Sequence, residues 1–146
     1  MDGIEHVALA LYPRGKHLGL LYRVRAGVPI HIAHLCWHHR LVNVPADPTK
    51  ILFWISLDLD QDQAEQVAAQ CREVGRAGVG RFFPYANSSP RGFFLNERLE
   101  FIYGAGSLGL TCASFVLAVF NFVGIDLVNY DSWPIRPGDE QWLEKI

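Results

Sequence analysis

The sequence has little excess charge of either sign. Thirteen Lys and Arg residues stand against fifteen Asp and Glu residues, which gives a formal net charge of -2 and a pI near 6.3. A surface that binds nucleic acid needs an excess of basic side chains to neutralise phosphates. We therefore expect no nucleic-acid partner.

Cysteine is also scarce. The chain has three cysteines, Cys36, Cys71 and Cys112, at wide spacing. A disulfide-rich scaffold would have an even number of cysteines at closer spacing, so the sequence excludes such a scaffold. Because the number of cysteines is odd, at least one thiol must remain unpaired within the chain. Each cysteine is therefore a candidate for a buried structural thiol or for a reactive one.

Long apolar runs are missing as well. The densest run, residues 108–125, is marginally short for a membrane span and contains Ser114 and Asn121. We expect it to form a buried helix, and we expect no membrane span. The first six residues lack the basic start and apolar run of a secretory signal, which predicts a cytoplasmic protein or export by a signal-independent route.

What the sequence does contain is enough apolar material for one core. Of its 146 residues, 50% are hydrophobic and 19% are charged, which excludes disorder. A chain of this length fits one domain, residues 1–146, and leaves no room for separate catalytic and binding domains.

The first third of the chain predicts a β-sheet. Residues 6–12, 17–24 and 30–37 are β-rich runs with short turns between them, which is typical of an antiparallel meander. Pro45, Asp47 and Pro48 then interrupt the pattern, and residues 51–57 predict a fourth, mostly buried strand.

Two helices are predicted further along. Residues 60–76 have Asp62 and Glu65 at capping-box spacing, with Gly75 and Gly78 as stop signals. Residues 111–123 are apolar on nearly every side, with Thr111 as the N-cap and Gly124 just after the end. We expect the second helix to lie in the middle of the molecule.

The remaining segments are irregular but rich in aromatic residues. Residues 78–109 are expected to wrap the core, and the stretch 82–85 (Phe-Phe-Pro-Tyr) is a candidate lining for a substrate groove. The last segment, residues 126–146, carries Trp133 and Trp142 and predicts an arm laid across the surface.

Cys112 is the first candidate for chemistry. It falls in the opening turn of the predicted helix, where unpaired N–H groups and the helix dipole favour a thiolate. A thiol nucleophile also needs an imidazole within hydrogen-bond reach to take its proton. All six histidines lie in the predicted sheet region, and they are His6, His17, His31, His34, His38 and His39.

The chain also resembles a known family. Residues 110–116 (Leu-Thr-Cys-Ala-Ser-Phe-Val), followed by Gly-Ile-Asp-Leu at 124–127, are similar to the nucleophile helix of the NlpC/P60 branch of the papain-like superfamily. Residues 17–22 (His-Leu-Gly-Leu-Leu-Tyr) and 30–35 (Ile-His-Ile-Ala-His-Leu) resemble its histidine strand and the next strand. The order, histidine first and cysteine last, is that of the circularly permuted, lecithin:retinol acyltransferase-like and YiiX-like members.

This resemblance implies an α+β, papain-like fold, with an antiparallel sheet packed against a central helix that bears the nucleophile. By the resemblance, Cys112 is the nucleophile, His17 is the general base, and His34 orients the imidazole. His6 remains an alternative base, in which case His17 would be the orienting residue. His31 is an alternative to His34, and strand alternation places these two on opposite faces.

The implied activity is a thiol hydrolase, an amidase or peptidase, that cleaves a peptide or amide substrate through a thioester and needs no cofactor. A secreted bacterial effector acting on peptidoglycan or a host protein would fit this activity. Thr111 and Ala113-Ser114 replace the Asn and Glu-His that flank the cysteine in the acyltransferase subgroup, so transfer between lipids is the less favoured alternative.

Two other hypotheses use the same residues differently. One is a non-enzymatic interaction module that binds a protein partner through the C-terminal arm and the aromatic segment. The other is a zinc site, because His34, Cys36 and His38 alternate onto one face of a strand and would leave an open position on the metal.

Overall fold

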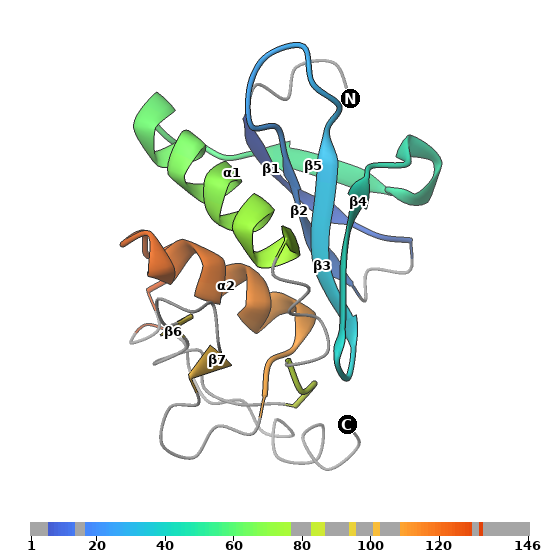
Figure 1. Ribbon diagram of the computed structural model, residues 1–146, viewed down its shortest axis with the longest axis vertical. Coiled ribbons are helices and arrows are strands. Elements are labelled where there is room, and N and C mark those ends of the chain that lie inside the picture. The colour runs from blue at the N-terminus through green and yellow to red at the C-terminus, as the bar shows by residue number, and fades with distance from the viewer. Residues whose placement is uncertain are drawn as a thin grey trace.

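The fold is α+β and consists of an antiparallel sheet with two helices on one side of it (Figure 1). The computed structural model describes residues 6–13, 17–76, 83–86, 94–95, 101–102, 109–129 and 132. The remainder of the predicted aromatic segment, and the C-terminal arm with Trp133 and Trp142, lie outside the described residues.

Five strands make up the main sheet, in the order β4-β3-β2-β1-β5. They are β1 (Val7–Leu11), β2 (Leu18–Tyr22), β3 (His31–Trp37), β4 (Arg40–Pro45) and β5 (Phe53–Ser56). All neighbouring strands are antiparallel. The first three strands form the expected meander, β4 extends it by one strand, and β5 returns to pair with β1 at the opposite edge.

The sequence did not predict β4. Trp37 pairs with Arg40, so only His38 and His39 connect β3 to β4. His39 has φ 55, a conformation that such short turns usually assign to Gly or Asn. The two histidines of this turn therefore do not indicate a hairpin in the sequence. The strand β4 also lacks the strict alternation between buried and exposed residues that would indicate a strand.

The prediction of a mostly buried fourth strand at residues 51–57 was wrong about burial. That strand is β5, and Phe53 and Ile55 are 48% and 55% exposed. An edge strand pairs on one side only, and the apolar composition that favours a strand does not specify whether a second layer covers it.

The helix α1 (Gln61–Arg76) begins one residue away from the predicted boundary and has a different cap. Asp60 accepts a hydrogen bond from the Gln63 N–H at 2.8 Å, and the Gln63 side chain accepts from the Asp60 N–H at 3.2 Å. This reciprocal pair replaces the predicted one between Asp62 and Glu65. Gly75 lies inside the helix, where a Cβ atom would overlap the Asn43 side chain.

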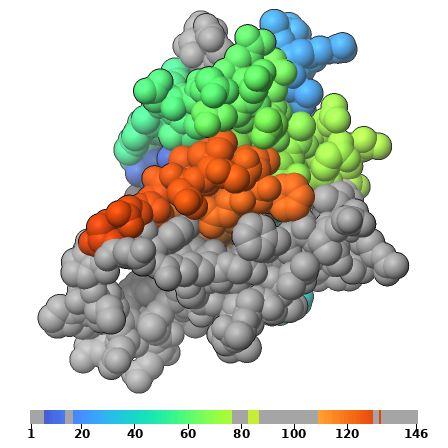
Figure 2. Space-filling model, turned by 90° about the vertical axis from the view of Figure 1, so that its left-hand side faces the viewer, coloured from blue at the N-terminus to red at the C-terminus, as the bar shows by residue number. Residues whose placement is uncertain are grey.

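The helix α2 (Cys112–Phe122) has the predicted caps. Thr111 and Ser114 bond each other reciprocally across the first turn, and Gly124 has φ 78 just after the end. Figures 1 and 2 show α2 directly beside α1. As expected, α2 is central, because it contacts β2 and β3 as well as α1.

The main core lies between the sheet and the two helices. Its largest fully buried side chains include Phe83, Phe115, Phe120, Leu20, Leu35 and Leu110. A smaller cluster of Ala8, Ala10, Leu21 and Ile32 covers the opposite face of the sheet. Short elements complete the described fold, namely the 3-10 helix η1 (Pro48–Lys50) and the strand pair β6 (Phe94–Leu95) and β7 (Phe101–Ile102).

Within the described part of the chain, no helix combines the length and apolarity that crossing a bilayer requires. The helix predicted within the apolar run at residues 108–125 is α2, which has 11 residues.

Candidate cysteine–histidine site

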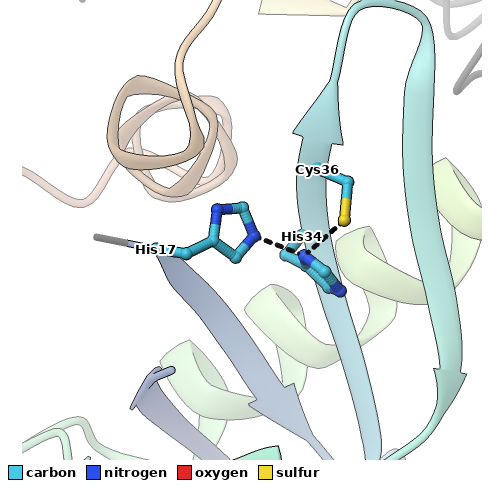
Figure 3. Close-up of side chains that lie close together, drawn as sticks. All are labelled: His17, His34 and Cys36. Carbon is cyan, nitrogen blue, oxygen red and sulfur yellow. Dashed lines mark hydrogen bonds between the residues drawn. The ribbon is translucent and has the colours of Figure 1, made fainter. Parts of the chain in front are cut away.

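The candidate site lies at one end of the sheet, where β2 begins, β3 ends and α2 begins. His17 directly precedes β2, His34 and Cys36 belong to β3, and Cys112 is the first residue of α2. Leu20 pairs with Ala33, so the register places Gly19 opposite His34 and His17 opposite Cys36. Figure 3 shows the three side chains from the strands converging on one point.

Cys112 is almost buried, with 8% of its surface exposed. Burial by itself raises the pKa of the thiol, but the hydrogen bonds that the sulfur shares with the His17 ring, the Leu18 backbone and the Tyr85 side chain, together with the charge of His17, more than compensate, and the pKa of Cys112 is lowered from its ordinary value. The position at the start of a capped helix adds backbone N–H groups and a favourable dipole. Cys112 therefore has the surroundings of an activated thiol.

His17 connects Cys112 to a second histidine. Its Nε2 atom lies 2.5 Å from Nδ1 of His34, and the two rings meet edge to face with centroids 4.7 Å apart. Because Nε2 is engaged with His34, Nδ1 is the nitrogen of His17 that remains for Cys112. The site is thus a continuous chain of hydrogen bonds from Cys112 through His17 to His34.

His34 is held in place from several sides. Its Nε2 atom lies 3.2 Å from the hydroxyl of Tyr12, and 5% of the residue is exposed. Gly19 makes room for it, because a Cβ atom at Gly19 would lie 3.1 Å from the Cβ of His34. Burial, the positive potential of His17 and that of Arg40 lower the pKa of His34 to about 4, so it is neutral at neutral pH.

Tyr85 belongs to the site, and sequence reasoning did not single it out. Its pKa is raised by burial and by the neighbouring Cys112 sulfur, with which it is hydrogen-bonded. A bridge between Tyr85 and Leu110 sets this position, just before α2. The available signal was the aromatic stretch 82–85, which was predicted to line a groove; only the fold shows that Tyr85 reaches the sulfur.

Tyr12 was also missed, since it was predicted only as the end of a strand. Tyr12 follows β1, and its backbone N–H donates to the carbonyl of His17 at 3.1 Å. The rings of Tyr12, His17 and His34 lie in mutual contact, with centroids 4.7 to 5.3 Å apart.

His6, the alternative base, lies at the other end of the β1–β2 hairpin. It precedes Val7, which pairs with Tyr22, whereas His17 precedes Leu18, which pairs with Leu11. At about 3.3 Å per residue, the two histidines are separated by about 20 Å along the strands. The structure brings His17 to Cys112 and leaves His6 away from it.

His31, the alternative third residue, faces away from the site. Its ring packs on Tyr22 with a centroid distance of 5.7 Å, and Tyr22 belongs to the main core. His34 shares the opposite face with Ile32, as strand alternation predicts. His17 contacts His34 and Cys112 because it lies before the first residue of β2, at the end of the sheet.

The three residues predicted for zinc are not the three that the structure brings together. His34 and Cys36 are neighbours, with Nδ1 and Sγ 3.5 Å apart. His38 instead accepts a hydrogen bond from the Tyr85 N–H at 3.2 Å, because an irregularity between Leu35 and Trp37 interrupts the alternation. His17 takes the third position, and the ligand atoms of His17, His34 and Cys36 all lie within 4.8 Å of one another.

All three cysteines are free thiols, in very different surroundings. Cys71 is fully buried in α1, and burial raises its pKa to about 12. Burial also raises the pKa of Cys36, where Arg40 acts in the opposite direction. Of the three, only the pKa of Cys112 is lowered.

No protein-family model, curated protein or solved structure matches the chain. The resemblance to the NlpC/P60 branch therefore stays a prediction from the sequence. What the protein does has to follow from the geometry of the site itself.

Proposed function

We propose that the protein is a cysteine hydrolase that cleaves an amide or ester bond through a thioester on Cys112. The observation that carries this proposal is the hydrogen-bonded chain Cys112–His17–His34, which begins at the first residue of a capped helix. A nucleophile, a base and a residue that orients the base are the three parts that such a reaction needs.

The protonation states follow from the contacts. Neutral His34 carries one ring proton, and if Nε2 donates it to the Tyr12 oxygen, Nδ1 is left to accept from His17. His17 then has its proton on Nε2 and a lone pair on Nδ1, directed at Cys112. This tautomer is the one that accepts the thiol proton.

In the first half of the reaction, the Cys112 sulfur attacks the substrate carbonyl carbon, and His17 holds the proton taken from the thiol. The carbonyl oxygen becomes negative, and the N–H groups at the start of α2 stabilise it, together with the Tyr85 hydroxyl at the same sulfur. His17 gives its proton to the leaving amine or alcohol as the carbon–heteroatom bond breaks. A thioester remains on Cys112.

In the second half, water attacks the thioester. His17 accepts a proton from the water, the carbon–sulfur bond breaks, and the acid product leaves with Cys112 restored. An amine or alcohol in place of water would make the same intermediate an acyltransferase. A hydrolase and an acyltransferase would use the same residues of this site in the same roles.

The experiment that tests the proposal is to trap the thioester. Incubation with p-nitrophenyl esters of increasing acyl length, followed by mass spectrometry of the intact and digested protein, is expected to show one acyl group on Cys112. The Cys112→Ala variant should lose the adduct and the turnover, and His17→Gln should form it at least about 100-fold more slowly. Cys71→Ala serves as the matched control and should acylate like the wild type.

The proposal would be wrong if Cys112→Ala turned over the esters at the wild-type rate, or if the acyl group resided equally on Cys36. That result would favour the interaction module. Adding hydroxylamine or an amino-acid amide to the acylated protein then separates a hydrolase, which releases acid, from an acyltransferase, which releases the transferred product.

A further inference from the structure

A third side chain points at the imidazole pair, and the hydrolytic reaction does not use it. The Cys36 thiol lies 3.5 Å from Nδ1 of His34, the same nitrogen that faces His17 (Figure 3). Two imidazole nitrogens and one sulfur thus converge within 4.8 Å of one another. Nitrogen and thiolate sulfur are the ligands that zinc prefers, in catalytic and in structural sites.

We infer that His17, His34 and Cys36 form a zinc-binding site, and that zinc bound there inhibits the hydrolase reversibly. Zinc binding itself is independent of the proposed function, whereas the inhibition rests on it. The expected ligand atoms are Nε2 of His17, Nδ1 of His34 and Sγ of Cys36. Binding replaces the proton of the Cys36 thiol, which is released to solvent.

The distances suit a tetrahedral ion after a small adjustment. Ligand atoms around zinc are separated by about 3.3 Å for two nitrogens and about 3.5 Å for nitrogen and sulfur, from bond lengths of about 2.0 and 2.3 Å at the tetrahedral angle. The distance between His34 and Cys36 already has this value. The two imidazole nitrogens, now 2.5 Å apart, need to separate by somewhat less than 1 Å, which a rotation of the His17 ring provides.

The surroundings of His34 are those of a metal ligand. A histidine that binds zinc through one ring nitrogen usually engages the other one with a polar neighbour, which fixes the tautomer and the ring orientation. The Tyr12 hydroxyl does this at Nε2 of His34. Gly19 leaves room for the Cβ atom of His34. With three protein ligands, the fourth position of the ion remains open for water.

The inhibition follows from the tautomer of His17. When zinc binds Nε2, the single proton of the neutral ring resides on Nδ1, the nitrogen that faces Cys112. His17 is then a hydrogen-bond donor to the sulfur and has no lone pair with which to take the thiol proton. Removing the ion with a chelator restores the lone pair.

The first test measures binding without reference to activity. Reduced protein that has been treated with EDTA and desalted is titrated with zinc in competition with a chromophoric chelator. We expect one ion per chain, and at least about 100-fold weaker binding for Cys36→Ser, since a ligand is lost. His38→Asn and Cys112→Ala are the matched controls and should bind zinc like the wild type.

Cobalt provides a second readout that does not depend on affinity. Cobalt bound to the wild type should show a sulfur-to-metal charge-transfer band, which Cys36→Ser should lose and Cys112→Ala should retain. Wild-type affinity of Cys36→Ser, or loss of the band in Cys112→Ala but not in Cys36→Ser, would overturn the assignment. Circular dichroism of each variant establishes that it is folded.

The last step links the ion to the reaction. Zinc should abolish acylation of Cys112 in the wild type and leave acylation of Cys36→Ser unchanged at the same concentration, with full recovery on adding EDTA. Equal inhibition of both proteins would contradict the regulatory role. If Cys112 did not acylate at all, the hydrolase would be refuted, while the binding and cobalt results would still decide the metal site.

Discussion

The two helices resemble each other closely, yet their cysteines differ in chemistry. Both pack on the same face of the sheet, and both begin with a reciprocal pair of side-chain and backbone hydrogen bonds, Asp60 with Gln63 in α1 and Thr111 with Ser114 in α2. Each helix contains one cysteine. Cys71 lies in the middle of α1, and Cys112 is the first residue of α2.

Burial alone does not distinguish these two thiols, because Cys71 is 0% exposed and Cys112 is only 8% exposed. The groups in contact with each sulfur determine its pKa. Cys71 is surrounded by the apolar core, and this burial raises its pKa to about 12. Cys112 has the same burial penalty, but three hydrogen bonds to the sulfur lower its pKa. A position at the end of a helix makes these partners available.

The largest expected difference between the helices is in thiol reactivity. At neutral pH, a pKa of about 12 leaves about one Cys71 in 10⁵ ionised, whereas a pKa below 9.0 leaves more than about one Cys112 in 100. Iodoacetamide should therefore alkylate Cys112 more than about 1000-fold faster than Cys71 in the native protein. Timed quenching and peptide mass spectrometry measure both rates at once, and in urea the two rates should converge. Equal alkylation rates of Cys71 and Cys112 in the native protein would show that Cys112 is not activated.

Stability should show the reverse order. Cys71→Ser places a hydroxyl in the apolar core and should lower the free energy of unfolding by about 2 to 3 kcal/mol. Cys112→Ser keeps hydrogen-bonding partners and should cost less than about 1 kcal/mol. Urea denaturation followed by circular dichroism compares the two variants. A larger loss for Cys112→Ser would mean that its role is mainly structural.

The pH dependence of stability should report His34. Its folded pKa of about 4 lies below the ordinary value of 6.5, so the unfolded chain binds the proton first as the pH falls. The free energy of unfolding should therefore be unaffected above pH 6.5 and fall between pH 6.5 and pH 4, by about 2 kcal/mol after allowance for solvent screening.

The His34→Gln variant isolates this contribution. In EDTA, its free energy of unfolding should change less with pH than that of the wild type over the same range. Both proteins have the same carboxylates, so the effect of the carboxylates cancels when the two free energies are subtracted. Parallel curves would show that the pKa of His34 is not depressed in the folded protein.

The smallest effect concerns the two helix caps. Asp60→Ala and Thr111→Ala should each lower the free energy of unfolding by about 1 kcal/mol, because each removes one capping acceptor. Only Thr111→Ala should also slow the alkylation of Cys112, by about two- to threefold, because a frayed first turn weakens the field at the sulfur. An equal effect of Asp60→Ala on alkylation would remove the link between the cap and the thiol.

Much of this fold could be predicted from local sequence signals. Four strands of the main sheet, both helices and the caps of α2 follow from β-rich runs, helical spacing and Thr111 with Gly124. The strand β4 and the exposure of β5 could not be predicted, because a histidine turn has no recognisable composition and because edge position depends on the tertiary fold.

The sequence predicts that the site contains a cysteine and histidines, but it does not decide which histidines belong to it. Cys112, His17 and His34 were predicted from their positions and from the family resemblance, and the structure brings these three together. Choosing His17 over His6 required the register of the hairpin, and choosing His34 over His31 required the direction of each side chain. Tyr12 and Tyr85 join the site through contacts between distant segments, which no local pattern records.

The site is also assembled from opposite ends of the sequence. His17 directly precedes β2, whereas Cys112 is the first residue of α2, so about two thirds of the chain lies between them. Closing so long a loop costs entropy that only the finished core repays. A nascent or partly unfolded chain therefore carries an ordinary thiol, and full reactivity appears only when α2 has docked, so that the sulfur reports the completion of folding.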